Sequence, residues 1–204
     1  MGKLNKIIGR QFGKPEGFIG RICCKVMNVI NKKMYKSVVN EISADADCNI
    51  LDVGYGNGYL LKLLFKKFRC NIKGIEVSPD AENFARKRNK KGIKSGKTEL
   101  IQADCCNMPF VSEEFNFVAS VNTIYFWNDT QKGLSEIHRV LKNGGIFYNA
   151  VYTEKWLKKL PYTSTGFKFF DRDDYIRLGK RAGFMEVKIK EIKKGKNFLV
   201  EFIK

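Results

Sequence analysis

The sequence predicts an α/β protein built on a mostly parallel sheet. After residue 48, short apolar runs of the length of buried strands alternate with longer segments whose apolar residues have helical spacing. The first run ends in a glycine-rich loop, the place where open α/β sheets bind ligands. Strands separated by helices pair in parallel through right-handed crossovers, so we expect helices on both faces of one sheet.

Seven strands are expected, each a short apolar run bounded by polar residues or glycine. They span residues 49–53, 71–77, 98–103, 115–121, 146–152, 184–189 and 197–203. A turn at residues 143–145 precedes the fifth strand. The last two strands have no helix between them, so we expect an antiparallel hairpin at the edge of the sheet.

The expected helices that connect these strands cover residues 58–68, a segment after Ser78, residues 129–141 and residues 171–182. The second of them has the clearest start. Ser78 can cap it, Pro79 suits its first turn, and Asp80 and Glu82 suit the positive end of its dipole.

Residues 1–47 follow a different pattern. Residues 17–42 have helical spacing, but the segment is too short for a second domain. We therefore expect one structural unit: a domain of residues 48–204 with a helical lid segment, residues 1–47, that packs on the sheet or over the site.

Composition places the chain among ordinary globular proteins, with 204 residues of which 44% are hydrophobic. No apolar run approaches 18 residues, so no membrane span is expected, and the first residues lack the apolar core of a secretory signal. The cysteines form no C-x-x-C pair and there is a single histidine, which predicts reduced thiols, no metal site and a cytoplasmic location. The six cysteines are Cys23, Cys24, Cys48, Cys70, Cys105 and Cys106. The sequence predicts no particular oligomeric state.

The net charge of +17 has two interpretations. It could serve an RNA or anionic-membrane partner, or it could reflect a lysine-rich solvated surface. The densest stretch, Arg86 to Lys97, has no acid, but basic residues exceed acidic ones along the whole chain. This even spread favours the second interpretation and leaves an RNA partner open.

The glycine loop, Asp52 to Gly58, reads DVGYGNG. Its spacing is G-x-G-x-G, whereas the dinucleotide fingerprint is G-x-G-x-x-G. In a nicotinamide oxidoreductase, Asp52 would also place a carboxylate against phosphates. The same carboxylate suits a ligand that carries an amino group and a sulfonium, so the loop disfavours a dinucleotide.

Two further acids follow the next two strands. Glu76 ends the second strand, where one carboxylate can accept from both hydroxyls of a ribose, and Asp104 follows the third, where it can accept from an adenine amino group. Three successive strands thus end in an acid, which favours a cationic nucleoside without phosphates.

These segments resemble the motifs of the class I S-adenosylmethionine-dependent methyltransferases. The similar segments are, in order, ILDVGYGNGYL, GIEVS, QADCCNMPF, FNFVASVNTIYFW and EIHRVLKNGGIF, the last with Asn143 where the family usually has proline. Further upstream, RQFGKPEGFIGR and KVMNVINKKMY resemble the start of a bacterial and archaeal subgroup of small stand-alone members. The resemblance implies a Rossmann-like fold, S-adenosylmethionine as cofactor and S-adenosylhomocysteine as product.

The resemblance also implies roles for residues. The loop glycines lie against the cofactor, Asp52 near its amino-acid part, Glu76 at the ribose, Asp104 and Cys105 at the adenine, and Asn122 at the methionine part. Tyr55 stands where small residues are commoner, so its ring either covers the cofactor or points outward. The implied cofactor-binding residues are Asp52, Gly54, Tyr55, Gly56, Gly58, Glu76, Val77, Asp104, Cys105 and Asn122.

The methyl acceptor is less well specified. Aromatic residues after the fourth strand could form a wall around the sulfonium, grip an apolar substrate or simply fill the core. We take Phe12, Tyr125 and Trp127 as candidate substrate contacts, Tyr125 as the candidate for any proton transfer, and His138 as part of the scaffold. Because no D/N-P-P-Y/F/W motif follows this strand, amino methylation of adenine in nucleic acid is disfavoured. A small-molecule acceptor is expected, with an RNA methyltransferase or a non-catalytic binding protein as alternatives.

Overall fold

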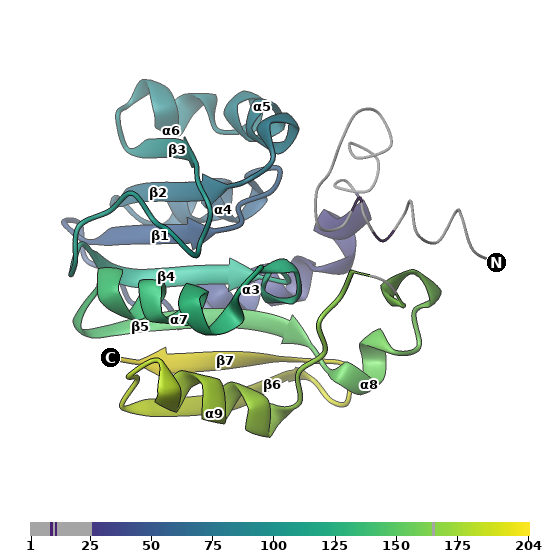
Figure 1. Cartoon of the computed structure of the whole chain (residues 1–204). Coiled ribbons are helices and arrows are strands. Elements are labelled where there is room, and N and C mark those ends of the chain that lie inside the picture. The colour runs from purple at the N-terminus through teal and green to yellow at the C-terminus, as the bar shows by residue number, and fades with distance from the viewer. Residues whose placement is uncertain (1–8, 10, 12–25, 165) are drawn as a thin grey trace.

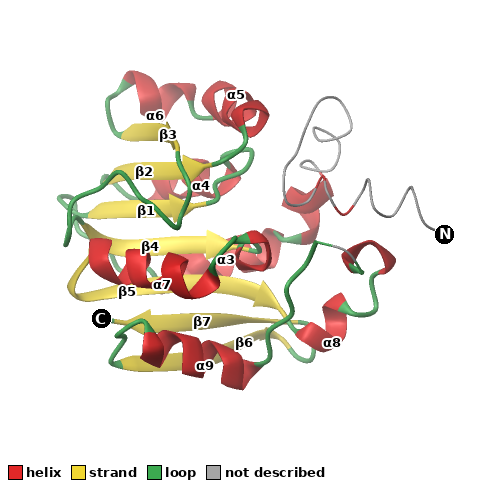
Figure 2. Cartoon of the chain, viewed as in Figure 1, coloured by secondary structure: helices red, strands yellow, loops and turns green. Residues whose placement is uncertain are grey.

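The structure, a computed structural model, describes Gly9, Gln11 and residues 26–164 and 166–204. Its centre is a seven-stranded sheet in the order β3-β2-β1-β4-β5-β7-β6, with helices on both faces, which confirms the predicted fold class (Figures 1 and 2). The strands are β1 (Asn49–Val53), β2 (Asn71–Glu76), β3 (Thr98–Gln102), β4 (Phe115–Val121), β5 (Leu141–Tyr152), β6 (Glu186–Lys193) and β7 (Asn197–Ile203).

The C-terminal hairpin joins the edge of the sheet through its second strand, β7, which pairs with β5. Strands β1 to β5 pair in parallel, and β7 is antiparallel to both of its neighbours, β5 and β6. Strand β7 therefore enters between β5 and β6, and the edge strand β6 runs in the same direction as β5. The expected turn at residues 143–145 lies inside β5, where the pairing register with β4 shifts and Gly144 has a φ of +74°.

The helices form two layers. Helices α3, α4 and α5 pack on one face of the sheet, and α7 and α9 on the other (Figure 1). Two helices, α6 and α8, are too short to show a helical period in the sequence. The described helices are α3 (Lys32–Glu41), α4 (Tyr59–Lys67), α5 (Pro79–Arg88), α6 (Lys90–Lys94), α7 (Thr130–Val140), α8 (Glu154–Leu157) and α9 (Arg172–Arg181), with short 3₁₀ turns η1 (Ile124–Phe126) and η2 (Pro161–Thr163).

Side-chain caps begin α5 and α7, which follow β2 and β4. The Ser78 hydroxyl accepts a hydrogen bond from the Ala81 amide at 3.3 Å, as the sequence predicts for α5. The Asp129 carboxylate accepts one from the Lys132 amide at 2.9 Å at the start of α7. These caps fix where the loops at the carboxyl end of the sheet turn into helices.

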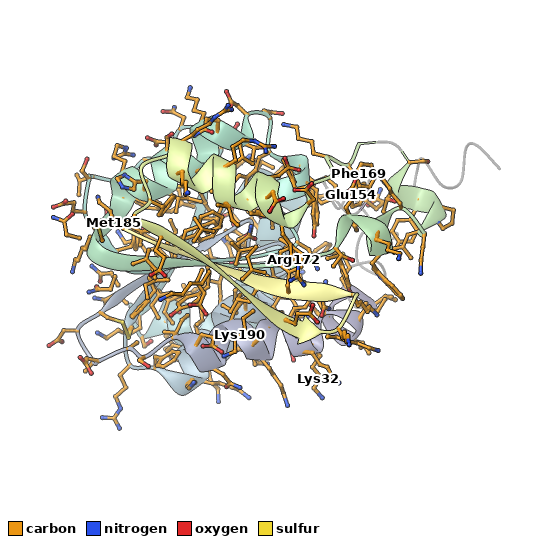
Figure 3. The ribbon with its side chains drawn as sticks, turned by 90° about the horizontal axis from the view of Figure 1, so that it is seen from below. Lys32, Glu154, Phe169, Arg172, Met185 and Lys190 are labelled. Carbon is orange, nitrogen blue, oxygen red and sulfur yellow. A yellow bond between two sulfur atoms is a disulfide. The ribbon has the colours of Figure 1, made fainter. Side chains whose placement is uncertain are left out.

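Helix α3 is part of the core. Its side chains Met34 and Val38 are fully buried, and α3 contacts the sheet from β4 to β6. Seen from below, the β6–β7 hairpin lies between α9 and α3, with Lys190 on the α3 side, where it pairs with Glu41 (Figure 3). Residues 32–41 of the expected lid thus pack on the sheet, and the expected helix from residue 17 to residue 25 lies outside the described residues.

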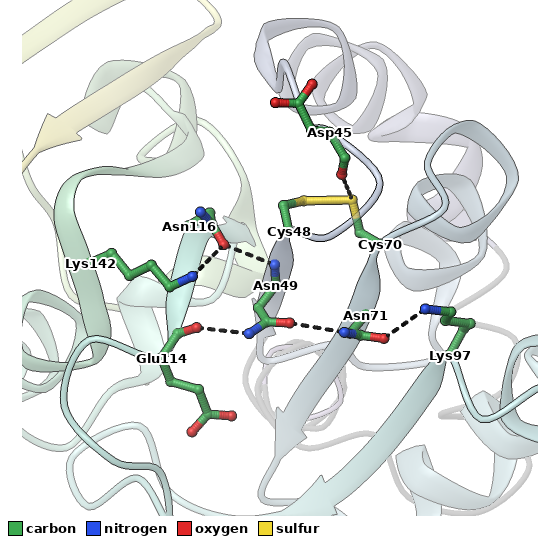
Figure 4. Close-up of a disulfide and its surroundings, with 9 residues drawn as sticks. All are labelled: Asp45, Cys48, Asn49, Cys70, Asn71, Lys97, Glu114, Asn116 and Lys142. Atoms are coloured by element: carbon green, nitrogen blue, oxygen red, sulfur yellow. Dashed lines mark hydrogen bonds between the residues drawn. A yellow bond between two sulfur atoms is a disulfide. The ribbon is translucent and has the colours of Figure 1, made fainter.

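A disulfide joins Cys48 and Cys70, with their Cα atoms 5.1 Å apart (Figure 4). The prediction that all the thiols are reduced is therefore wrong for this pair. Each cysteine immediately precedes a strand, and the parallel register pairs Asn49 with Asn71, so the crossover brings the two cysteines together. Local sequence spacing cannot show this contact, because 22 residues separate the two cysteines. Cys105 and Cys106 are free.

Reduction of this disulfide should lower the stability of the protein. Opening a covalent loop of this length costs about 3 kcal/mol of folding free energy. Thermal melts with and without a thiol reductant measure the effect, and the double variant Cys48→Ser/Cys70→Ser, which should not respond to reductant, is the control. Identical melting temperatures of the natural protein under both conditions would contradict the prediction.

Among the described residues, no helix combines the length and the apolar character needed to cross a membrane.

Candidate cofactor and acceptor site

The glycine loop connects β1 to α4 at the carboxyl end of the sheet. Gly54, Gly56 and Gly58 all have positive φ, from +51° to +73°. A Cβ on Gly54 would lie 2.6 Å from the Thr123 side chain, whereas a Cβ on Gly56 would meet nothing within 4 Å. The chain thus packs tightly at the first glycine and leaves open space at the middle of the loop, where a ligand can approach backbone.

Asp52 is a buried carboxylate with an unused oxygen. Its side chain is 2% exposed, and its Oδ2 has no hydrogen-bond partner among the described residues. Burial, and then the negative charge of Glu76, raise the pKa of Asp52 well above its ordinary value. An unpaired buried carboxylate is costly, so a cationic ligand would stabilise this site.

Glu76 is held by the backbone on both of its carboxylate oxygens. Oε2 accepts from the Gly56 amide at 3.0 Å, and Oε1 accepts from the amides of Val77 at 2.9 Å and Ser78 at 3.0 Å. Burial raises the pKa of Glu76, and these three amides oppose the rise. The carboxylate is therefore fixed at the end of β2 and tied to the glycine loop. Val77 beside it is 49% exposed, an apolar surface available to a ring.

The loop after β3 carries the residues predicted to meet the adenine. Asp104 Oδ1 accepts from the Cys106 amide at 2.9 Å, and the Cys106 thiol donates to the Asp129 carbonyl at 3.2 Å. Burial, and then Cys106 and Asp104, raise the pKa of the Cys105 thiol. A buried thiol whose pKa is raised is a weak nucleophile, which agrees with a contact role for Cys105. The side-chain ligand atoms of Asp104, Cys105 and Cys106 lie within 4.8 Å of one another, and the absence of a metal site stays a prediction.

An ion pair on α7 holds the rest of this loop in place. Glu136 accepts from the Met108 amide at 2.9 Å and pairs with Arg139 at 2.6 Å. Arg139 in turn donates to the Phe110 carbonyl at 2.7 Å. These contacts set the position of the loop between β3 and β4.

Asn122 follows β4 at the centre of the carboxyl edge. It has a φ of +60°, its amide donates to the Ala150 carbonyl at 3.0 Å, and its side chain is 8% exposed. A non-glycine residue in this conformation is uncommon and is often found at functional sites. Asn122 also lines a cavity at this edge of the sheet.

That cavity has a volume of about 250 Å³ and is mostly apolar and aromatic. Its walls come from five separate parts of the chain: the residues before α3, the loop with η1 after β4, the end of β5 with α8 and η2, the segment between η2 and α9, and the turn before β7. Among the described residues, the lining consists of Met27, Ile30, Asn31, Asn122, Tyr125, Phe126, Tyr152, Trp156, Leu157, Leu160, Tyr162, Phe167 and Lys196.

Tyr125, a predicted substrate contact, lines this cavity, and its hydroxyl is engaged. The Tyr152 amide donates to the Tyr125 oxygen at 2.6 Å, and the side chain is 2% exposed. Burial, and then the neighbouring Tyr175, raise the pKa of Tyr125 well above its ordinary value. A buried phenol with a raised pKa is a poor proton acceptor at neutral pH, so these contacts favour positioning of the end of β5. The proton role of Tyr125 stays a prediction.

The variant Tyr125→Phe separates these two roles. It leaves the Tyr152 amide without its partner, so we expect a loss of about 1–2 kcal/mol of stability and cofactor affinity within about twofold of the natural protein. Denaturant unfolding and titration with S-adenosylhomocysteine measure the two quantities. Unchanged stability would contradict the structural role.

The other predicted residues have different positions. The Trp127 ring stacks on Phe147 with centroids 6.4 Å apart, its indole N–H donates to Thr123 at 3.2 Å, and it does not line the cavity, so this placement does not support a substrate contact. The Tyr55 ring is buried against Gly74 of β2, so it does not point outward. Phe12 lies outside the described residues.

His138 packs edge-on against Phe184 on the side of α7 and α9, in agreement with the predicted scaffold role. The sequence predicts Trp156, Tyr162, Phe167 and Phe169 as candidates to line a lid or access cleft, and the first three line this cavity. Nothing in the sequence indicates the lining residues Met27, Leu160 and Lys196. They come from segments with no shared motif, and only the fold brings them together.

Comparison with known proteins identifies the family. Residues 51–149 match the family described as "Methyltransferase domain". The 2-methyl-6-phytyl-1,4-hydroquinone methyltransferase of Arabidopsis thaliana is 30% identical over 149 residues, which are 72% of this chain and 43% of that protein. The chain belongs to the class I S-adenosylmethionine-dependent methyltransferases. It spans less than half the length of this plant relative.

Solved methyltransferase structures share the fold. An S-adenosylmethionine-dependent methyltransferase from Aquifex aeolicus has a TM-score of 0.73 at 19% identity, covering 88% of this chain and 95% of that one. The Haemonchus contortus phosphoethanolamine N-methyltransferase 2, in complex with S-adenosyl-L-methionine, has a TM-score of 0.67 at 21% identity, covering 78% of this chain and 38% of that one.

S-adenosylmethionine is the cofactor of this family, and the Haemonchus contortus structure contains it. The residues at the site fit it. The unpaired Asp52 oxygen suits the ammonium group of the cofactor's amino-acid part. The open space at Gly56 lets a ligand approach the backbone of the loop, and the fixed Glu76 carboxylate suits the hydroxyls of a ribose. The family membership replaces the alternative of a nicotinamide oxidoreductase.

Proposed function

We propose that this methyltransferase transfers a methyl group from S-adenosylmethionine to a small apolar molecule held in the aromatic cavity. The observation that carries the proposal is the position of the cavity, whose lining includes Asn122, the residue that we assign to the methionine part of the cofactor. A mostly apolar lining with a few polar groups is typical of small-molecule sites. The plant relative is named for a ring-containing acceptor, a hydroquinone, which supports the same substrate class.

The residues of the chain would act by binding and alignment. The cofactor supplies a methyl group on a sulfonium, which is already activated for transfer. Asp52 holds the amino-acid part, Glu76 the ribose, Asp104 and Cys105 the adenine, and Asn122 lies beside the methionine part. The described lining of the cavity contains neither a carboxylate nor an imidazole, so an acceptor that needs no strong base is favoured.

The N-terminal segment would serve as a cover. Met27, Ile30 and Asn31 supply one wall of the cavity, although they precede the sheet domain in the sequence. We therefore propose that these residues before α3 cover one side of the bound acceptor. The cytoplasmic location stays a prediction.

Two alternatives remain open to test. An RNA acceptor rests on the net charge of +17 alone and predicts RNA binding that weakens steeply with salt. A non-catalytic binding protein predicts cofactor binding without methyl transfer to any acceptor pool. Each has an experimental outcome different from that of the proposed enzyme.

The test is calorimetric titration of the full chain with S-adenosylhomocysteine, with NAD as the control, followed by transfer of a radiolabelled methyl group to pools of small phenols, amines, thiols and RNA. We expect saturable binding of S-adenosylhomocysteine alone and label in a small-molecule pool. Label only in RNA would overturn the substrate class, and binding of NAD alone would overturn the cofactor assignment.

A further inference from the structure

The cavity contains one kind of charge. Lys196 is its only charged lining residue among those that the structure describes. The Lys196 ammonium lies 4.4 Å from the centroid of the Trp156 ring and 5.8 Å from that of Tyr152. Several other lysines, including Lys158 and Lys190, pair with an acid. Lys196 has no carboxylate within ion-pair distance in residues 26–164 and 166–204.

A cation in this setting favours an anionic ligand. Aromatic faces stabilise an ammonium on one side, but they do not satisfy its remaining N–H donors. A charge that is partly removed from water without a counter-ion gains from a partner of opposite sign. Since the ammonium is a single point charge, one monoanionic group such as a carboxylate matches it better than a phosphate dianion.

The sheet gives the distance between this charge and the cofactor side of the cavity. Asn122 follows β4, and Lys196 precedes Asn197, which pairs with Tyr152 at the end of β5. Strand β5 lies between β4 and β7, so two strand spacings separate the two positions. With about 4.8 Å for each spacing and an offset of two residues along the strands at about 3.3 Å each, the backbones at Asn122 and Lys196 are about 12 Å apart.

We propose that the methyl acceptor is an amphipathic carboxylic acid. Its apolar body, two fused rings or a chain of similar length, fills the aromatic cavity, its carboxylate pairs with Lys196, and its accepting atom lies at the Asn122 end. This inference rests on the proposed function, because it places the acceptor in the cavity beside the cofactor.

Binding of two matched probes tests the inference without requiring turnover. The first is a hydroxynaphthoic acid with its hydroxyl and carboxyl at opposite ends of the fused rings, and the second is its neutral carboxamide. Both are titrated by calorimetry into the full chain saturated with S-adenosylhomocysteine. We expect the acid to bind at least about tenfold more tightly than the amide, about 1.4 kcal/mol.

The variants Lys196→Gln and Lys194→Gln assign this preference to one residue. Lys194 is exposed on the same hairpin turn, so Lys194→Gln removes the same charge without touching the cavity. We expect Lys196→Gln to bring the two affinities within about twofold of each other, with the amide affinity unchanged, and Lys194→Gln to keep the preference.

Three results would overturn the inference: equal affinities in the natural protein, a preference that survives in Lys196→Gln, or failure of both probes to bind while S-adenosylhomocysteine binds. In each of them the proposed methyl transfer stands, because cofactor binding is measured separately. Failure of S-adenosylhomocysteine to bind would instead remove the proposed function and this inference with it.

Discussion

Replacing Asp52 by Asn is expected to weaken cofactor binding strongly while making the unliganded protein more stable. The carboxylate is 2% exposed and one of its oxygens has no partner among the described residues. Asn has the same shape without the charge. Loss of a charged hydrogen bond of about 1.5–3 kcal/mol predicts an affinity for S-adenosylhomocysteine that is lower by about 10- to 150-fold.

The gain in stability has a predicted pH dependence. The pKa of Asp52 in the folded protein lies well above its ordinary value of 3.8, so the folded state binds this proton more tightly than the unfolded state does. The stabilisation that protonation provides is complete below pH 3.8 and is lost as the pH rises through the raised pKa. Above that pKa, Asp52→Asn should therefore be more stable than the natural protein by about 1–2 kcal/mol.

The natural protein should also bind the cofactor more tightly as the pH rises through the same window, because the carboxylate must ionise to hold a cationic ligand. Denaturant unfolding and calorimetry at several pH values measure both effects. Asp173→Asn, an exposed substitution in the first turn of α9, is the control; it should leave the cofactor affinity unchanged and lower the stability by at most about 1 kcal/mol, through the helix dipole. Cofactor affinity unchanged in Asp52→Asn would contradict our assignment of this residue.

The second large effect is expected at the glycine loop, where two similar substitutions should affect different properties: one the stability of the protein, the other its affinity for the cofactor. In Gly58→Ala, the new Cβ would lie 2.3 Å from Asn89 Nδ2 and 2.9 Å from Ala85 Cβ, at a φ of +71°. Left-handed strain of about 1–2 kcal/mol and overpacking of about 1–3 kcal/mol add together. We expect this variant to lose about 2–5 kcal/mol of stability, or to fail to fold.

In Gly56→Ala, the new Cβ meets nothing within 4 Å, at a φ of +51°. Only the backbone strain of about 1–2 kcal/mol remains, so the protein should fold. The added methyl group projects into the open space of the loop that we assign to the cofactor. We therefore expect the affinity for S-adenosylhomocysteine to fall by about tenfold or more, a loss of about 1.4 kcal/mol.

Gly96→Ala is the matched control for the strain. Gly96 has a φ of +70°, its Cβ would also meet nothing within 4 Å, and it lies in the turn before β3, remote from the loop. It should lose as much stability as Gly56→Ala and keep the natural cofactor affinity. Equal affinities of Gly56→Ala and Gly96→Ala would show that the cofactor does not approach Gly56.

The sequence alone determined the features that depend on local pattern. Strands β1, β4 and β7 have the bounds predicted from their apolar runs, and Ser78 caps α5 as its helix-start pattern indicates. The glycine loop and the acids Asp52 and Glu76 were identifiable because each stands at the end of a strand, and parallel strands end at one edge. Periodicity, caps and motif spacing all act within a few residues, so they can be read directly from the chain.

The tertiary structure decided what depends on segments that meet only after folding. The disulfide between Cys48 and Cys70 follows from the register of two strands. The position of the Trp127 ring, outside the cavity lining, follows from its packing on Phe147. The aromatic cavity combines the residues before α3 with α8, η2 and Lys196, which share no sequence motif. These contacts result from the order β4-β5-β7 and from burial of side chains between layers, and such long-range packing leaves no local pattern in the sequence.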